Sequence, residues 1–142
     1  MMQDAQFMDD DFLWRHLRDL PAFRALLRAV EARLYQDLLP LEEPVLDVGC
    51  GDGHFASVAL PGPLTLGMDP ASGVLREAQK RGAYGLVSQT LGDALPLPSG
   101  LVSTVVSNSV LEHIPEVDPV LAEISRVLRP GGRFIFCVPS DH

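Results

Sequence analysis

The sequence predicts an α/β fold in which helices cover both faces of a parallel sheet. Between residues 44 and 138, short apolar runs alternate with segments whose apolar residues recur at helical spacing. The first run, 45–48, contains β-branched residues and is too short for a helix. A glycine-rich turn follows it, and a helical segment begins at His54. A strand, a glycine turn and a helix in this order open a nucleotide-binding βαβ unit.

The remaining elements follow from the same patterns and from the breaks between them. Proline and glycine mark turns at 61–63, 92–98 and 130–132. Asp118 before Pro119 predicts an N-cap and the first helical position. We expect strands at 45–48, 64–69, 84–88, 104–107 and 133–138, and helices at 54–60, 71–81 and 118–128.

Residues 1–40 are predicted to be helical, with a new segment beginning at Pro21. We expect 1–40 to form a helical cap and 41–142 to form the sheet domain. In one interpretation the cap lies over a ligand cleft, and Trp14 and Tyr35 contact a substrate. In the other it is an amphipathic helix that covers the sheet. Its apolar positions after Pro21 are Phe23, Leu26, Leu27, Val30, Leu34 and Leu38.

Composition limits the class of protein. A chain of 142 residues is long enough for one domain with its own core. A net charge of −8 argues against non-specific nucleic-acid binding, which needs Lys and Arg to meet phosphates. No apolar run approaches the length of a membrane span, and the acidic N-terminus has the wrong sign for a targeting signal. We therefore expect a cytoplasmic protein, and the spacing of Cys50, Cys137 and the histidines predicts no metal site.

The spacing of the glycines indicates which ligand the turn accepts. A dinucleotide fingerprint has its third glycine three residues after the second, but that position holds His54, whose ring would obstruct close approach. Gly49, Gly51 and Gly53 after a strand that carries Asp47 instead resemble motif I of class I S-adenosylmethionine-dependent methyltransferases. The alternative is a glycine turn with no ligand.

Two acids stand where such a site needs hydrogen-bond acceptors. Asp69 follows the second strand, 20 residues after Gly49, where a βαβ site places an acid on the ribose hydroxyls; Pro70 follows it. The alternative is an acidic cap at a strand end. Gly-Asp-Ala before Leu-Pro-Leu-Pro resembles the methyltransferase loop around adenine. By that resemblance Asp93 accepts a bond from the adenine amino group, and Ala94 and Leu95 lie against the ring; alternatively, Asp93 bonds only its own turn.

The segment after the fourth strand resembles the part of the family that lies under the methionine end of the cofactor. This implies that Ser107 and Asn108 border the cofactor, with Cys50 in the glycine turn and Asp47 orienting that turn and the ammonium group. An Asp is common in the family where Ser103 stands. His113 is a candidate general base because an unperturbed imidazole titrates near pH 6.5; the alternative is a structural histidine.

The resemblance extends over residues 44–138, because Leu-Arg-Pro-Gly-Gly-Arg-Phe is similar to the family's turn into strand five. It implies S-adenosylmethionine as cofactor and methyl transfer to a small-molecule acceptor. A module that binds S-adenosylmethionine or its product without catalysis stays open, whereas the glycine spacing disfavours a nicotinamide-dependent oxidoreductase.

The family fold has seven strands, and only five are predicted here. The apparent absence of the last two would leave strand five as a bare apolar edge. This indicates a truncated form, part of a longer protein, or a natural short form whose edge is covered by a partner chain, for example in a homodimer. The acceptor itself is not predicted.

Overall fold

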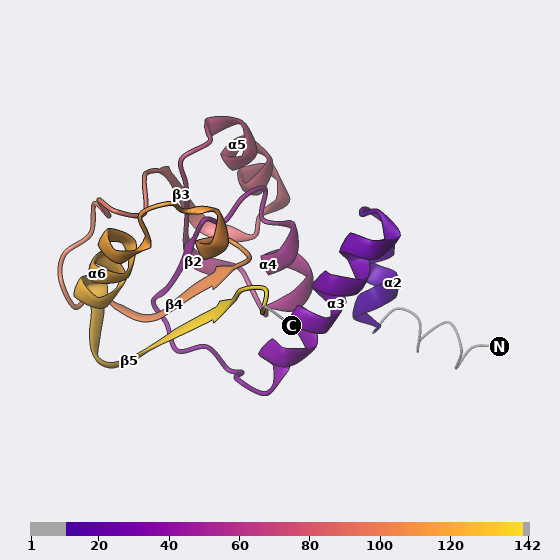
Figure 1. Cartoon of the computed structure of the whole chain (residues 1–142), viewed down its shortest axis with the longest axis horizontal. Helices are drawn as coiled ribbons and strands as arrows, with labels where there is room; N and C mark the ends of the chain where they lie inside the picture. Colours follow the sequence, from indigo (N-terminus) through magenta and orange to yellow (C-terminus); the bar gives the residue numbers. More distant parts are fainter. Residues whose placement is uncertain (1–10, 141–142) are drawn as a thin grey trace.

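Five parallel strands form one sheet in the order β3-β2-β1-β4-β5 (Figure 1). The computed structural model describes residues 11–140. A strand occurs at each of the five predicted places, so the parallel Rossmann-like sheet is confirmed. The last strand begins earlier than predicted and includes the turn predicted at 130–132. Their bounds are β1 Val45–Val48, β2 Leu64–Asp69, β3 Tyr84–Gln89, β4 Val102–Asn108 and β5 Leu128–Cys137.

Helices cover both faces of this sheet, and each face has its own apolar core. On one face α3, α4 and α5 pack against Val45 and Val106. On the other face α6 packs against Leu46, Val48 and Val105. The helices are α2 Phe12–Leu17, α3 Ala22–Gln36, α4 His54–Ala59, α5 Ser72–Arg81, α6 Val117–Val127 and the 3-10 turn η1 Leu111–His113.

The sheet order determines where a ligand can bind. Strand β1 lies between β2 and β4, so the chain moves outward in one direction from β1 to β3 and in the other direction from β4 to β5. In open parallel sheets, ligands bind beyond the carboxyl ends of the strands at such a switch point. The segments after β1, β2, β3 and β4 all meet there.

Some boundaries differ from the predicted ones. Helix α6 begins at Val117 with Glu116 as its N-cap, so Asp118 lies in the first turn rather than at the cap. Strand β4 begins at Val102, and its register with β5 shifts between Val102 and Thr104, opposite the Pro-Gly-Gly segment that begins β5. These shifts do not change the order of the elements.

The orientation of α3 is the main departure from the predicted fold. Its buried side consists of Ala25, Ala32 and Tyr35, whereas the large apolar side chains predicted to cover the sheet face outward. Small alanines allow the α3 backbone to approach α4 closely, which leaves the bulkier positions on the far side of the helix. Phe23 is 74% exposed and Leu34 is 58% exposed.

Trp14 and Tyr35 do not occupy substrate-contacting positions. Trp14 on α2 is half-exposed, and Tyr35 is buried with its ring centroid 5.5 Å from that of Phe55. Neither residue lines the cavities at the carboxyl end of the sheet. Within residues 11–140, no helix has the length and apolar character that a membrane span requires.

Candidate functional site

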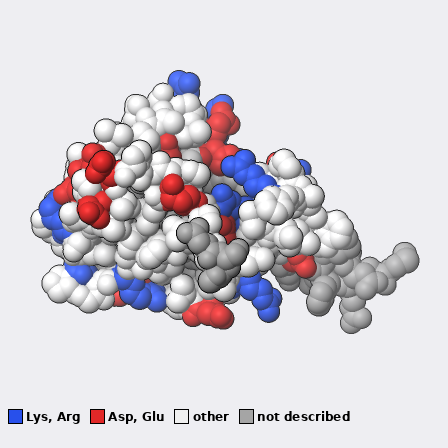
Figure 2. Space-filling model, viewed as in Figure 1, with Lys and Arg blue, Asp and Glu red and all other residues white. Residues whose placement is uncertain are grey.

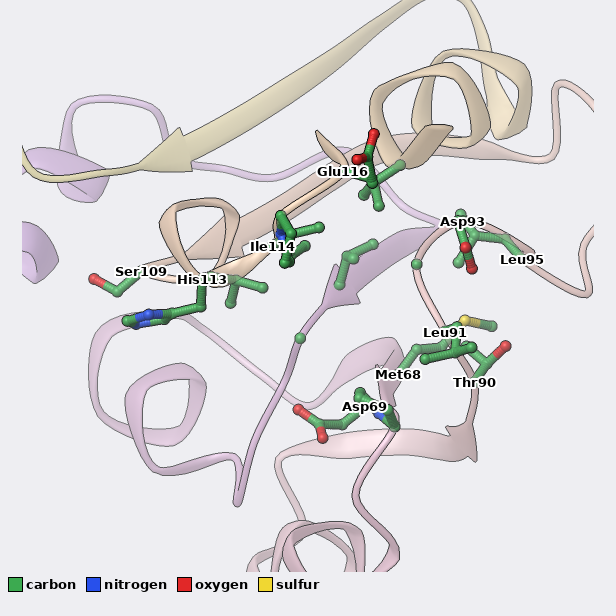
Figure 3. Close-up of a pocket in the computed structure, with 17 residues that line it drawn as sticks. Met68, Asp69, Thr90, Leu91, Asp93, Leu95, Ser109, His113, Ile114 and Glu116 are labelled. Atoms are coloured by element: carbon green, nitrogen blue, oxygen red, sulfur yellow. The ribbon is translucent and has the colours of Figure 1, made fainter. Parts of the chain in front are cut away.

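A cavity of about 600 Å³ opens at the carboxyl ends of β1, β2 and β3, beside the segment after β4 (Figure 3). Its volume lies within the range of small-molecule sites. Figure 3 shows Asp93 and Leu95 on one side and Ser109 and His113 on the opposite side. The lining residues are Val48, Gly49, Met68, Asp69, Pro70, Thr90, Leu91, Gly92, Asp93, Leu95, Ser109, Val110, His113, Ile114, Pro115, Glu116 and Val120.

The glycine turn after β1 is attached to the end of β2 by three backbone donors. The amides of Gly49 and Cys50 both donate to the carbonyl of Met68, at 2.8 and 2.9 Å. The amide of Gly51 donates to the Asp69 carboxylate at 3.0 Å. The position of the turn is therefore set by the neighbouring strand and by an acid that lines the cavity.

Two of the glycines in this turn are required for different reasons. Gly49 has φ +74°, and a Cβ there would lie 2.5 Å from a methyl group of Val110, so the turn packs directly against the segment after β4. Gly51 has φ +56° and no atom within 4 Å of the place a Cβ would take. Gly51 therefore leaves open space above the bare backbone. Gly53, the N-cap of α4, packs instead against the Ala83 and Tyr84 side chains.

Asp47 lies beneath the turn rather than in the cavity. Its carboxylate accepts a 2.5 Å hydrogen bond from the Tyr84 hydroxyl, and only 8% of the residue is exposed. Burial raises the pKa of Asp47 to about 7; the Tyr84 hydrogen bond opposes this rise, and the nearby Asp69 charge adds to it. The Tyr84 ring fits because Gly67 has no Cβ, which would lie 2.9 Å from that ring.

Asp69 connects the cavity wall to two backbone segments. One carboxylate oxygen accepts from the Gly51 amide, and the other accepts from the Ala71 amide at 2.9 Å. Pro70, which also lines the cavity, accepts a hydrogen bond from the Gln89 side chain through its carbonyl. The acid thus has a defined orientation at the cavity edge.

The loop after β3 contributes Asp93 and Leu95 to the cavity. Asp93 is exposed, Leu95 is buried, and Ala94 between them does not line the cavity. The loop is held by a pair of residues on α6 that the sequence analysis did not assign to it. Glu123 accepts from the Leu95 amide at 2.9 Å, and the Arg126 guanidinium donates to the Leu95 carbonyl at 3.0 Å.

Arg126 also fixes Glu123 itself. The two side chains form an ion pair of 2.7 Å, and this hydrogen bond lowers the pKa of Glu123 to about 2. No local pattern could reveal the loop contacts of Arg126, because its partner Leu95 lies 31 residues earlier in the chain.

A second cavity of about 360 Å³ adjoins the first and shares Gly49, Ser109 and Val110 with it. It lies between α3 and the glycine turn, and two arginines of α3 line it. The predicted residues in its lining are Gly49, Cys50, Gly51 and Asn108; the others are Leu20, Arg24, Arg28, Asp52, His54, Phe55, Val74, Ser109 and Val110.

A polar network attaches α3 to the end of β4 at this second cavity. Ser109 accepts from Arg28 at 2.6 Å and donates to Glu31 at 2.8 Å. Asn108 also donates to Glu31 at 2.8 Å, while its own amide oxygen is buried without a hydrogen-bond partner. Ser109 has φ 54°, a conformation uncommon outside glycine and often found at functional sites.

The last two predicted site residues differ in their access to the cavities. Ser107 is fully buried, and its hydroxyl donates to the Val48 carbonyl at 2.9 Å, so it joins β4 to β1 and lines neither cavity. His113 lines the larger cavity from η1, and its side chain is 77% exposed. Its Nε2 lies 3.8 Å from a carboxylate oxygen of Glu112.

Comparison with known proteins assigns the family. Residues 46–136 match the family model described as a methyltransferase domain. The chain belongs to the class I S-adenosylmethionine-dependent methyltransferases. The resemblance carried by the glycine turn and the adenine-type loop is thereby confirmed for the family as a whole.

Individual relatives of this methyltransferase have different named activities. The chain is 37% identical over 122 residues to the malonyl-[acyl-carrier protein] O-methyltransferase of Methylococcus capsulatus, covering 79% of this chain and 44% of that one. It is 34% identical over 101 residues to the demethylmenaquinone methyltransferase of Symbiobacterium thermophilum, covering 64% and 40%. The chain thus spans less than half the length of these two relatives.

A solved structure shows the same fold. An S-adenosylmethionine-dependent methyltransferase from Thermotoga maritima superposes with a TM-score of 0.68 at 25% identity, covering 77% of this chain and 50% of that one. The match shows that the two chains share a fold over this part of their lengths.

Replacing Asp47 with Asn should change how stability depends on pH. An ordinary aspartate titrates near 3.8, whereas folded Asp47 holds its proton to about pH 7. Between these two values the unfolded chain has released the proton and the folded chain has not, so this group lowers the free energy of unfolding as pH rises through the window. The amide of Asp47→Asn cannot titrate but can still accept from Tyr84.

Urea unfolding of both proteins from about pH 4 to about pH 8 measures the effect. We expect stability to fall less with rising pH in Asp47→Asn, by at most ~4 kcal/mol across the window. Parallel pH profiles for the two proteins would show that Asp47 does not hold its proton in the folded state.

Proposed function

We propose that this chain binds S-adenosylmethionine across the two joined cavities and transfers its methyl group to a small-molecule acceptor. The observation that carries the proposal is the convergence of the glycine turn, Asp69 and Asp93 around one cavity at the switch point of the sheet. These three features lie far apart in the sequence, and a nucleoside needs all of them within one ligand length.

The residues present fit this cofactor. Leu95 offers an apolar surface for the adenine ring, and Asp93 beside it offers an acceptor for the amino group. Each carboxylate oxygen of Asp69 accepts one hydrogen bond from a backbone amide, so each keeps a further lone pair that can accept from a ribose hydroxyl. Asn108 borders the second cavity, where the methionine end of the cofactor would lie.

The other predicted site residues act on the shape of the turn in this proposal. Asp47 supports the turn from below through Tyr84, and Ser107 fixes the end of β4 against β1. Gly49, Cys50 and Gly51 present the turn to the second cavity. Pro70 borders the ribose position, whereas Gly53 and Ala94 shape their loops without touching the ligand.

The chemistry requires little from the protein beyond position and exclusion of water. S-adenosylmethionine supplies a methyl group already activated by its sulfonium. Apolar side chains of Met68, Leu91, Ile114 and Val120 exclude water from the larger cavity. Holding an acceptor in line with the methyl group is the main source of rate enhancement in such a reaction. His113, on the wall opposite Asp93, is placed to take a proton from the acceptor.

The acceptor class is inferred from the relatives and from the cap. The names of two relatives specify malonyl-[acyl-carrier protein], an acyl group on a carrier protein, and demethylmenaquinone, a small molecule. We propose that the helices of residues 11–40 act as the predicted cap, because Arg24 and Arg28 of α3 line the second cavity. A cytoplasmic location stays a prediction.

Strand β5 forms the edge of the sheet within residues 11–140. Phe136 and Val138 on this edge are 49% and 44% exposed. A second copy of the chain covering this edge stays a prediction.

A module that binds S-adenosylmethionine without catalysis is the second candidate. The observation that favours it concerns the His113 ring: among residues 11–140, no carboxylate lies within hydrogen-bond distance to orient it, and Glu112 is 3.8 Å away. A catalytic base is usually held by such a partner. Incubation with radiolabelled S-adenosylmethionine and a panel of thioester acids and reduced quinones separates the two functions by whether a methylated product appears.

Thermal unfolding with saturating ligands tests the proposed cofactor. A ligand that binds only the folded chain raises the melting temperature by mass action. We expect S-adenosylmethionine and S-adenosylhomocysteine to raise it by roughly 5–10 °C at a hundredfold excess over Kd, and NAD⁺ to leave it unchanged. A rise with NAD⁺ alone would contradict the proposal.

Asp93→Ala is the matched site variant for this measurement, because Asp93 is exposed. In the absence of ligand, the variant should melt at the same temperature as the wild type. It should bind S-adenosylhomocysteine about tenfold more weakly, because one hydrogen bond to a charged acceptor is lost. Asp37→Ala, an exposed acid outside both cavities, serves as the control and should bind normally. If both variants bound S-adenosylhomocysteine with equal affinity, Asp93 would not be an acceptor for the adenine amino group.

His113→Gln tests the role of the histidine with an acceptor from the panel. Because a positioned base typically contributes a factor of ~10² or more, the rate should fall by at least that factor. Affinity for S-adenosylhomocysteine should not change in the variant. An unaltered rate would exclude His113 as the base.

A further inference from the structure

Helix α3 carries a second apolar face opposite the one that packs on the sheet. Phe23, Leu26, Leu27, Val30 and Leu34 form this outer stripe, and each is about half-exposed or more. The buried side of the same helix already supplies its contacts with α4. Figure 2 shows a largely uncharged surface over α3. Within residues 11–140, the stripe is therefore left without a packing partner.

The spacing within the stripe indicates the shape of its partner. Phe23, Leu27, Val30 and Leu34 follow one another at intervals of four, three and four residues. This is the repeat of a helix that packs along another helix at a shallow angle, with side chains of one entering gaps of the other.

A groove next to the stripe makes this surface complementary to itself. The groove lies between α2 and α3 and has a volume of about 350 Å³. Its walls are Phe12, Leu13, Ala29, Val30 and Leu34, together with the charged residues Asp11 and Arg33. At the other end of the stripe Phe23 is the most exposed large apolar side chain within residues 11–140, at 74%. One surface therefore bears a protruding aromatic ring and, about three turns away along the helix, a groove with mainly apolar walls.

We propose that two copies of this chain associate through α3, antiparallel about a twofold axis, with Phe23 of each copy in the α2–α3 groove of the other. A twofold axis brings the same patch of both copies together, so each ring meets a groove. In this register Leu27 of one copy lies opposite Val30 of the second copy. The stripe itself carries no charged side chain, and Asp11 and Arg33 border the groove that receives the Phe23 ring.

The exposed area corresponds to a small interface. Full burial of the five stripe side chains would remove roughly 500 Å² per copy from solvent, or about 1,000 Å² for the pair, which is close to the smallest area of a specific interface. The groove walls add to this. The contact also bears on the site, because Arg28 and Glu31 of the same helix hold Ser109 at the second cavity.

Sedimentation equilibrium of the 142-residue chain over a wide concentration range tests the proposal. We expect a monomer–dimer equilibrium. Leu27→Glu should be monomeric at every concentration, with a melting temperature equal to that of the dilute wild type, because Leu27 is exposed in the single chain. Leu121→Glu, at an exposed leucine of α6, is the matched control and should dimerise normally.

A mixing experiment tests the antiparallel register. Leu27→Glu and Val30→Lys should each be monomeric alone, and their mixture should form a heterodimer, because the register places the introduced carboxylate opposite the introduced ammonium. A monomeric wild type would overturn the proposal. A dimer that survives Leu27→Glu but is lost in Phe136→Ser would place the interface at the β5 edge and overturn it too. Failure of the mixture to associate would overturn the antiparallel register.

Discussion

The site depends on the hydrogen bonds that join the glycine turn after β1 to the end of β2. Two successive amides of the turn share the Met68 carbonyl, and the next glycine amide donates to Asp69. Because Asp69 also accepts from the Ala71 amide, one carboxylate sets both the turn and the entry to α5. A parallel sheet makes this arrangement available, since the carboxyl ends of neighbouring strands lie side by side.

The charges of the two cavities differ in a way that matches a zwitterionic nucleoside. Asp69, Asp93 and Glu116 line the larger cavity, whereas Arg24 and Arg28, with one acid, Asp52, line the smaller one. An adenosine group with neutral hydroxyl and amino donors suits the acidic cavity. A ligand tail that carries a carboxylate suits the cavity with the arginines. The chain as a whole carries a net negative charge, so the two arginines on one face of α3 make the second cavity locally more positive than the rest of the molecule.

The sequence predicts those parts of the fold and site that depend on local patterns. Strand positions follow from β-branched runs and their breaks, and Gly49 and Asp69 follow from spacing after a strand. What local patterns could not predict is set by contacts between distant residues. Arg126 on α6 clamps the loop at Leu95, and Glu31 on α3 holds Ser109, which lies 78 residues later in the chain.

Helix α3 shows a different reason for failure of a sequence prediction. It has two apolar sides, and hydrophobicity alone selects the one with the larger residues. The fold instead buries Ala25 and Ala32, because only small side chains allow α3 to lie close to α4. Close packing of the two helices thus decided which side of α3 is buried, rather than the size of its apolar side chains. The larger side chains remain exposed in the single chain, where they contact solvent or a second copy.

A crystal structure of the chain with S-adenosylhomocysteine tests the central claim most directly. The account predicts electron density for adenine between Asp93 and Leu95, ribose hydroxyls on Asp69, and the homocysteine end over Gly51 in the second cavity. Density elsewhere on the molecule, or an empty cleft in crystals grown at saturating ligand, would contradict it.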